Sequence, residues 1–96
     1  MNYRLTVIET AREDISDAFE WYNMQSEFAA AYLIERLEEA FKHIAETPLI
    51  YQKVHREFRQ IILKPFPYVL LYYVKKEEVV VFRLWHTSRN PQKKFK

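Results

Sequence analysis

The sequence contains no cysteine and no glycine, and only four of its 96 residues are proline. Without cysteine, disulfides and thiolate metal sites are excluded, which fits a reducing cytoplasm. Without glycine, a glycine-rich phosphate loop is excluded, and we expect turns that avoid positive φ angles. No apolar run reaches the roughly 18–20 residues of a membrane span, and the N-terminal segment lacks signal-peptide order. We therefore expect a soluble, cytoplasmic protein.

The length corresponds to one domain, 1–96. The net charge of +2 conceals a strong asymmetry, because residues 9–46 carry ten acids against three bases, whereas residues 47–96 carry eleven bases against three acids. Charge segregated in this way indicates a surface for an acidic partner. Two solvated faces that merely differ in charge remain the alternative.

Hydrophobic periodicity predicts an α+β fold in the order β-α-α-β-β-β. A capping box at Thr10–Glu13 opens the first helix, Ser26 caps the second, and Pro48 ends it. The helices should form an antiparallel hairpin on one face of the sheet, while residues 49–57 show no period and are expected to be a loop. The expected strands are 3–8, 58–64, 67–74 and 79–86, the last three forming an antiparallel meander.

The strands 67–74 and 79–86 are apolar on both faces, although two helices can cover only one face. Simple alternation places one set of side chains on the spare face, which we expect to be wholly or partly uncovered: Tyr73, Val79, Val81, Arg83 and Trp85. An aromatic and an arginine among aliphatics are typical of an interface. A partner protein is the favoured occupant, and a homodimer through the same face is the alternative.

No cofactor or metal site is predicted. His43, His55 and His86 are scattered without ligand spacing. Ser88 lies near His86, but nothing suggests a nucleophile elbow. For His86 a structural role is favoured over a catalytic one.

The remaining candidates surround the C-terminal sheet: Arg59, Arg83, His86, Arg89, Lys93 and Lys94. Arginines with a histidine acid or base could stabilise phosphoryl transfer. The same cations could instead pair with carboxylates of a protein segment. Composition does not separate these two chemistries.

Several motifs together resemble the RelE/ParE toxins of bacterial type II toxin–antitoxin modules. They are Ala11 with Asp14-Ile15, Trp21-Tyr22, Pro48-Leu49-Ile50-Tyr51, Arg59, the run from Phe66 to Tyr72, and the run from His86 through Arg89 to Pro91. The resemblance implies a plasmid-stabilisation toxin that an acidic antitoxin holds inactive. It also implies one of two activities, since RelE-type members cut messenger RNA in the ribosomal A site and ParE-type members poison DNA gyrase.

The departures from the RelE pattern favour a ParE-like protein. Gln60 and Ile62 stand at basic positions, Val69 replaces a strand arginine, and Phe95 replaces a terminal tyrosine; only Arg89 matches cleanly. A ribosome-dependent nuclease would then depend on Arg59, His86 and Arg89 converging in one cleft, and placing the two arginines on opposite faces would argue against it.

We therefore expect a binding toxin that acts on DNA gyrase, with a messenger RNA endonuclease or a non-toxic relative as alternatives. The resemblance and the basic half together predict antitoxin or target contacts at Tyr73, Arg83, Trp85, Arg89, Lys93 and Lys94. The assembly would be a toxin–antitoxin hetero-oligomer or a homodimer.

Overall fold

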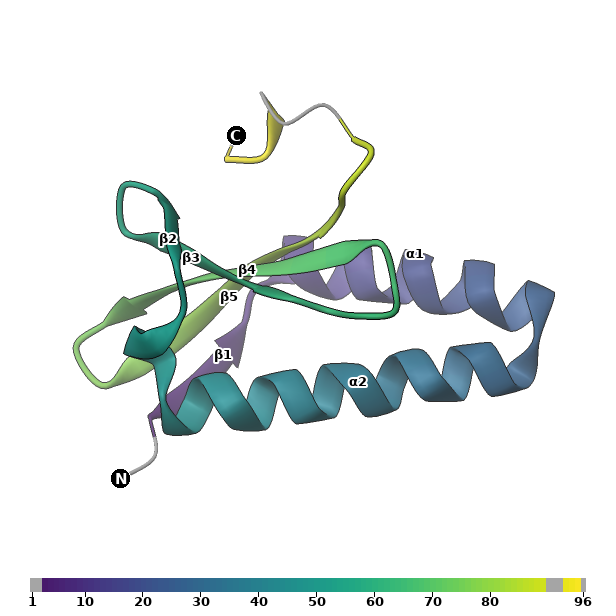
Figure 1. The fold of residues 1–96 in the computed structure, drawn as a ribbon, viewed down its shortest axis with the longest axis horizontal. Coiled ribbons are helices and arrows are strands. Elements are labelled where there is room, and N and C mark those ends of the chain that lie inside the picture. Colours follow the sequence, from purple (N-terminus) through teal and green to yellow (C-terminus); the bar gives the residue numbers. More distant parts are fainter. Residues whose placement is uncertain (1–2, 90–92, 96) are drawn as a thin grey trace.

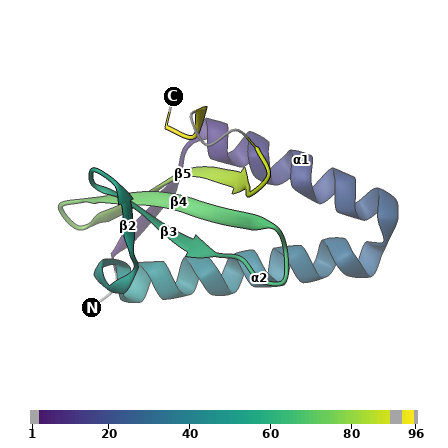
Figure 2. The same cartoon turned by 45° about the horizontal axis from the view of Figure 1, so that its top comes forward.

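The computed structural model describes residues 3–89 and 93–95, and it confirms the α+β prediction (Figure 1). The elements are β1 (Arg4–Val7), α1 (Glu9–Gln25), α2 (Glu27–Glu46), a 3₁₀ turn (Pro48–Ile50), β2 (Lys53–His55), β3 (Phe58–Ile62), β4 (Tyr68–Lys75) and β5 (Glu78–His86). The two helices run antiparallel and lie on one side of the sheet (Figures 1 and 2). No helix in the described ranges is long and apolar enough to cross a membrane.

The sheet has the strand order β1-β5-β4-β3-β2. Strands β3 to β5 form the predicted antiparallel meander, and β1 pairs with β5 in parallel. The segment expected to be a loop therefore contributes an additional strand, β2, which pairs with β3 at Lys53↔Arg59. Three residues are too short a run to reveal an alternating pattern in the sequence.

The two predicted helix caps differ in outcome. The Ser26 side chain accepts a hydrogen bond from Ala29 N at 3.4 Å, as expected of an N-cap. The capping box at Thr10 is absent, because α1 already begins at Glu9 and Ile8 occupies the cap position. The Ile8 N–H donates to Val81 O at 3.2 Å, so sheet pairing continues to the residue that starts the helix.

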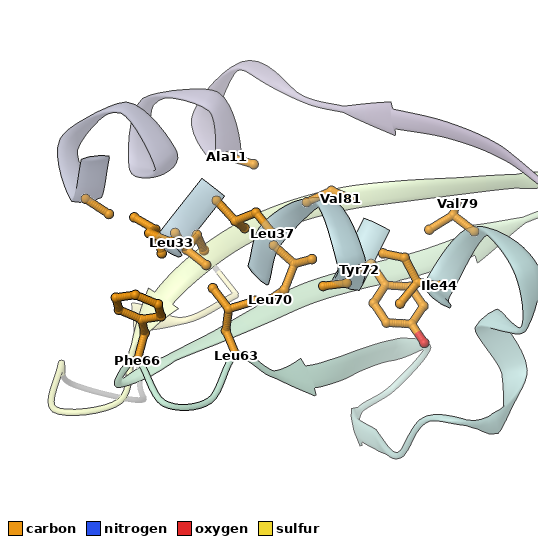
Figure 3. Close-up of a cluster of buried hydrophobic side chains, with 13 residues drawn as sticks. Ala11, Leu33, Leu37, Ile44, Leu63, Phe66, Leu70, Tyr72, Val79 and Val81 are labelled. Atoms are coloured by element: carbon orange, nitrogen blue, oxygen red, sulfur yellow. The ribbon is translucent and has the colours of Figure 1, made fainter. Parts of the chain in front are cut away.

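The main core lies between the helices and the sheet (Figure 3). It buries Leu33, Leu37 and Ile44 of α2 against Leu70 and Tyr72 of β4. The Tyr72 hydroxyl donates to Pro48 O at 2.6 Å, so this buried polar group is satisfied. Burial raises the pKa of Tyr72, which keeps the phenol neutral.

A β-bulge in β5 overturns part of the face assignment. Tyr72 pairs with Val81 while Leu71 pairs with Arg83, so Phe82 is the additional residue. Val79 and Val81 consequently point into the helix-covered core and have 0% exposure, although they were expected on the spare face. Arg83 and Trp85, as predicted, lie on the opposite, helix-free face of the sheet. An inserted residue reverses the alternation of side chains beyond it.

The face without helices has a core of its own. Val69, Leu71 and Trp85 are buried there, with Phe82 and Phe95 packed against them. The prediction that Trp85 is uncovered is therefore wrong: its exposure is only 2%. The reason is that the C-terminal segment returns over this face, on the side of the sheet opposite α2 (Figure 1).

The expectation that turns avoid positive φ is also wrong. Arg56 has φ 49° and Lys76 has φ 57°. Both residues lie in short links between antiparallel strands. Tight turns at such links need a left-handed backbone conformation, a position that glycine usually occupies.

Candidate functional site: a basic sheet end between two grooves

Arg83, predicted to bind a partner's acids, is already paired within the chain. Its Nε and Nη2 donate to the two carboxylate oxygens of Asp14 on α1, at 2.7 and 3.0 Å. Asp14 also accepts the Leu84 N–H at 3.1 Å, and both charged side chains are only 12% exposed. A bidentate carboxylate occupies the guanidinium fork, so Arg83 fastens α1 to β5 and offers little to a partner.

Arg89 is the exposed cation at the end of β5. Its guanidinium carbon lies 4.3 Å from the centre of the Trp85 ring, and the Arg89 N–H donates to His86 O at 3.0 Å. Stacking on the indole fixes the side chain while leaving it at the surface. Arg89 contributes to the walls of two grooves.

The first groove, here called the sheet groove, has a volume of about 300 Å³ and lies on the helix-free side. It is lined by Gln60, Ile62, Val69, Trp85, Thr87, Arg89 and Lys94. Gln60 Oε1 is buried and has no hydrogen-bond partner among the described residues. An unpaired buried acceptor next to two cations favours a ligand that supplies an N–H together with negative charge.

The second groove, here called the helix groove, holds about 530 Å³ between α1 and the start of β4. Trp21, Tyr22 and Tyr68 supply aromatic walls, and Asp17, His86 and Arg89 also line the groove. Burial raises the pKa of Tyr68, and Tyr22 and Asp14 raise it further; burial also raises the pKa of Tyr22. These phenols therefore act as neutral hydrogen-bonding walls. No pattern in the sequence indicated this groove, and the Trp21-Tyr22 pair entered only as part of the family resemblance.

His86 has local partners that suit the structural role favoured above. Its Nδ1 lies 2.7 Å from Ser88 Oγ and accepts the Ser88 N–H at 3.1 Å. Its ring meets Tyr68 edge-on at 5.1 Å. His86 thus shapes the turn after β5 and borders the helix groove with Arg89.

Arg59 lies apart from this pair. Its Nη1 donates to Tyr51 O at 2.6 Å and Leu49 O at 3.2 Å, which ties β3 to the segment after α2. Arg59 pairs with Tyr72, a residue of the helix-covered core, whereas Arg89 stacks on Trp85 of the opposite face. The convergence that a nuclease built on Arg59, His86 and Arg89 would require is not found.

The other predicted contact residues differ in accessibility. Lys93 is exposed, Lys94 is half-buried at the sheet groove, and Tyr73 is half-buried against Phe58 with ring centres 5.6 Å apart. Asn90 and Pro91 of the C-terminal motif lie outside the described residues. Among the residues that are described, no three His, Cys, Asp or Glu side chains gather as a metal site.

Comparisons with known proteins agree with this architecture. Residues 6–91 match the family described as ParE toxin of type II toxin-antitoxin system, parDE. The chain is 29% identical to Toxin ParE2 of Mycobacterium tuberculosis strains CDC 1551 / Oshkosh and ATCC 25618 / H37Rv, over 95% of this chain and 88% of the relative.

Two solved structures share the fold. The chromosomal ParDE TA system from P. aeruginosa superposes with a TM-score of 0.78 at 16% identity, covering 90% of this chain and 97% of that one. A copper-bound mutant toxin from Helicobacter pylori gives a TM-score of 0.56 at 22% identity, covering 90% and 96%. At these identities the likeness concerns the fold alone.

Proposed function

This chain belongs to the ParE toxin family of type II toxin–antitoxin systems, and from that premise we propose that it arrests bacterial growth by acting on DNA gyrase. A small acidic antitoxin holds it inactive in a toxin–antitoxin hetero-oligomer in the cytoplasm. The whole chain, 1–96, acts as one toxin domain that serves plasmid stabilisation. The family match supports the toxin role, and the separation of Arg59 from Arg89 weighs against the nuclease alternative.

The antitoxin segment is proposed to dock at the sheet groove and its cationic rim. The observation that carries this assignment is Arg89, exposed, held by Trp85 and common to both grooves. An extended acidic peptide would place carboxylates on Arg89 and Lys94 and a backbone N–H near Gln60 Oε1. Such a segment is disordered when free and gains its contacts by adding onto a preformed surface.

The proposal is tested with Arg89→Ala in the full-length protein. Losing a central arginine anchor typically costs roughly 2–4 kcal/mol, so affinity for the cognate antitoxin should fall about thirtyfold or more. Arg4→Ala removes an exposed cation from β1 and serves as the matched control. Equal loss in both variants would indicate a diffuse charge effect and would refute docking at Arg89.

The target is tested by inducing the toxin alone. If the toxin acts on gyrase, the induced cells should become filamentous and show a DNA-damage response. The purified toxin should also block supercoiling by purified gyrase. Immediate loss of protein synthesis with cleaved transcripts, detected by primer extension, would instead identify a ribosome-dependent nuclease. Normal growth with ample folded toxin would identify a non-toxic relative.

A further inference from the structure

The end of the helical hairpin carries a patch of exposed large apolar side chains that the antitoxin assignment does not use. We call Trp21, Met24, Phe28 and Tyr32 the tip patch; their exposures are 56%, 82%, 89% and 43%. All four lie close to Ser26, where α1 passes directly into α2, and this turn projects beyond the sheet (Figure 1). Contiguous exposed apolar side chains of this size mark interaction surfaces.

Two aromatic members of the patch, Trp21 and Tyr32, rest on a fixed support. Trp21 contacts Tyr22 edge-on at 4.9 Å, Tyr22 contacts Phe66 at 5.0 Å, and Phe66 contacts Tyr32 at 5.5 Å. Phe66, which is only 8% exposed, thus contacts both helices, through Tyr22 of α1 and Tyr32 of α2. A preorganised aromatic surface loses little conformational entropy on binding, which suits an anchor position.

The charge around the tip patch indicates what kind of partner it fits. Residues 13–35 contain six acids (Glu13, Asp14, Asp17, Glu20, Glu27 and Glu35) and no lysine or arginine. The next cation, Arg36, is paired with Glu39. Complementarity therefore requires a partner surface with lysine or arginine around apolar side chains.

This requirement excludes the other simple occupants. Nucleic acid and an acidic antitoxin segment would both meet like charge at the patch. Two copies of the chain joined tip to tip would place the same carboxylates face to face, because a twofold interface brings identical patches together. A basic surface on a different protein satisfies the charge and the apolar area at once.

We propose that the tip patch is the surface with which this toxin engages its protein target, through a basic, partly apolar region of that target. The inference rests on the proposed function. The two oppositely charged regions of the toxin then bind different partners: the basic sheet end binds the antitoxin, and the acidic end of the helical hairpin binds the target.

Two sets of substitutions test the inference with purified DNA gyrase as the probe. Met24→Ser with Phe28→Ser removes the most exposed apolar side chains, and Glu20→Lys with Glu27→Lys reverses the charge. Each set should weaken gyrase binding and supercoiling inhibition by about tenfold or more while the melting curve and antitoxin affinity stay unchanged. Ile50→Ser, at 73% exposure, and Glu38→Lys on α2 are the matched controls and should behave like the wild type.

The outcomes separate the two proposals. Full inhibition by both tip variants, beside active wild type, overturns the tip assignment and leaves the proposed function standing. Wild-type toxin without any effect on gyrase overturns the proposed function, and the assignment of the tip to the target with it. A wild-type dimer in sedimentation that the tip substitutions dissociate would identify a second copy as the occupant and would likewise overturn the inference.

Discussion

Replacing Trp85 by alanine should remove much of the free energy of unfolding, because this residue belongs to a buried core rather than to an open contact surface. The ring is 2% exposed, packs with Val69 and Leu71, and lies against the guanidinium groups of Arg83 and Arg89 at 5.0 and 4.3 Å. An indole buries roughly 200 Å², which at about 25 cal/mol/Å² sets an upper bound of about 5 kcal/mol. Substitutions of this kind cost about 3–5 kcal/mol in practice.

For a domain of this length, each kcal/mol lowers Tm by roughly 4–8 °C, so Trp85→Ala should melt at least about 12 °C below the wild type in circular dichroism. Trp85→Phe should retain most of the stability, because it keeps an aromatic ring in the cluster. Arg89→Ala is the control for the lost cation–π contact, worth about 0.5–1 kcal/mol at an exposed site. A Trp85→Ala protein that melts within about 3 °C of the wild type would show that the helix-free face is open, and the burial argument would fail.

Two further predictions concern the backbone and the buried phenol. Lys76→Gly should stabilise the protein by about 0.5 kcal/mol in chemical denaturation, because Lys76 has a left-handed backbone conformation that costs an L-residue about 1–2 kcal/mol. The extra conformational freedom of glycine in the unfolded chain offsets part of that gain. A loss of stability would contradict this prediction. Tyr72→Phe should cost about 1–2 kcal/mol near neutral pH, because Pro48 O loses its donor. Burial raises the pKa of Tyr72 above 10.0. The stability that this shift contributes is therefore complete below pH 10 and falls above it by about 1.4 kcal/mol per pH unit. This decline should be smaller in Tyr72→Phe. An unchanged slope between pH 10 and 11 would refute the assignment.

The sequence alone was sufficient for the helix hairpin and for the order of the elements apart from β2. Apolar residues at helical spacing, the Ser26 cap and the stop at Pro48 act within one or two turns of the chain, so they can be read without knowing the fold. The antiparallel meander followed equally from three apolar runs with short links. The motif combination also indicated a toxin of this family, and the charge asymmetry indicated a surface for an acidic partner.

The faces of the last strand required the tertiary structure. The bulge at Phe82 is one additional residue in an apolar run, which leaves no trace in a pattern of alternation, yet it moved Val79 and Val81 under the helices. The burial of Trp85 depends on Phe95 and Arg89 returning over the sheet from farther along the chain.

The candidate site divides in the same way. The sequence alone supplied the cations Arg59, Arg83 and Arg89, because charge is a property of each residue wherever it lies. Only the fold decided that Arg83 is held by Asp14, 69 positions away, that Arg59 binds backbone carbonyls, and that Arg89 remains at the surface. Pairing between charges distant in sequence is set by the packing of α1 on β5, and therefore by the tertiary structure.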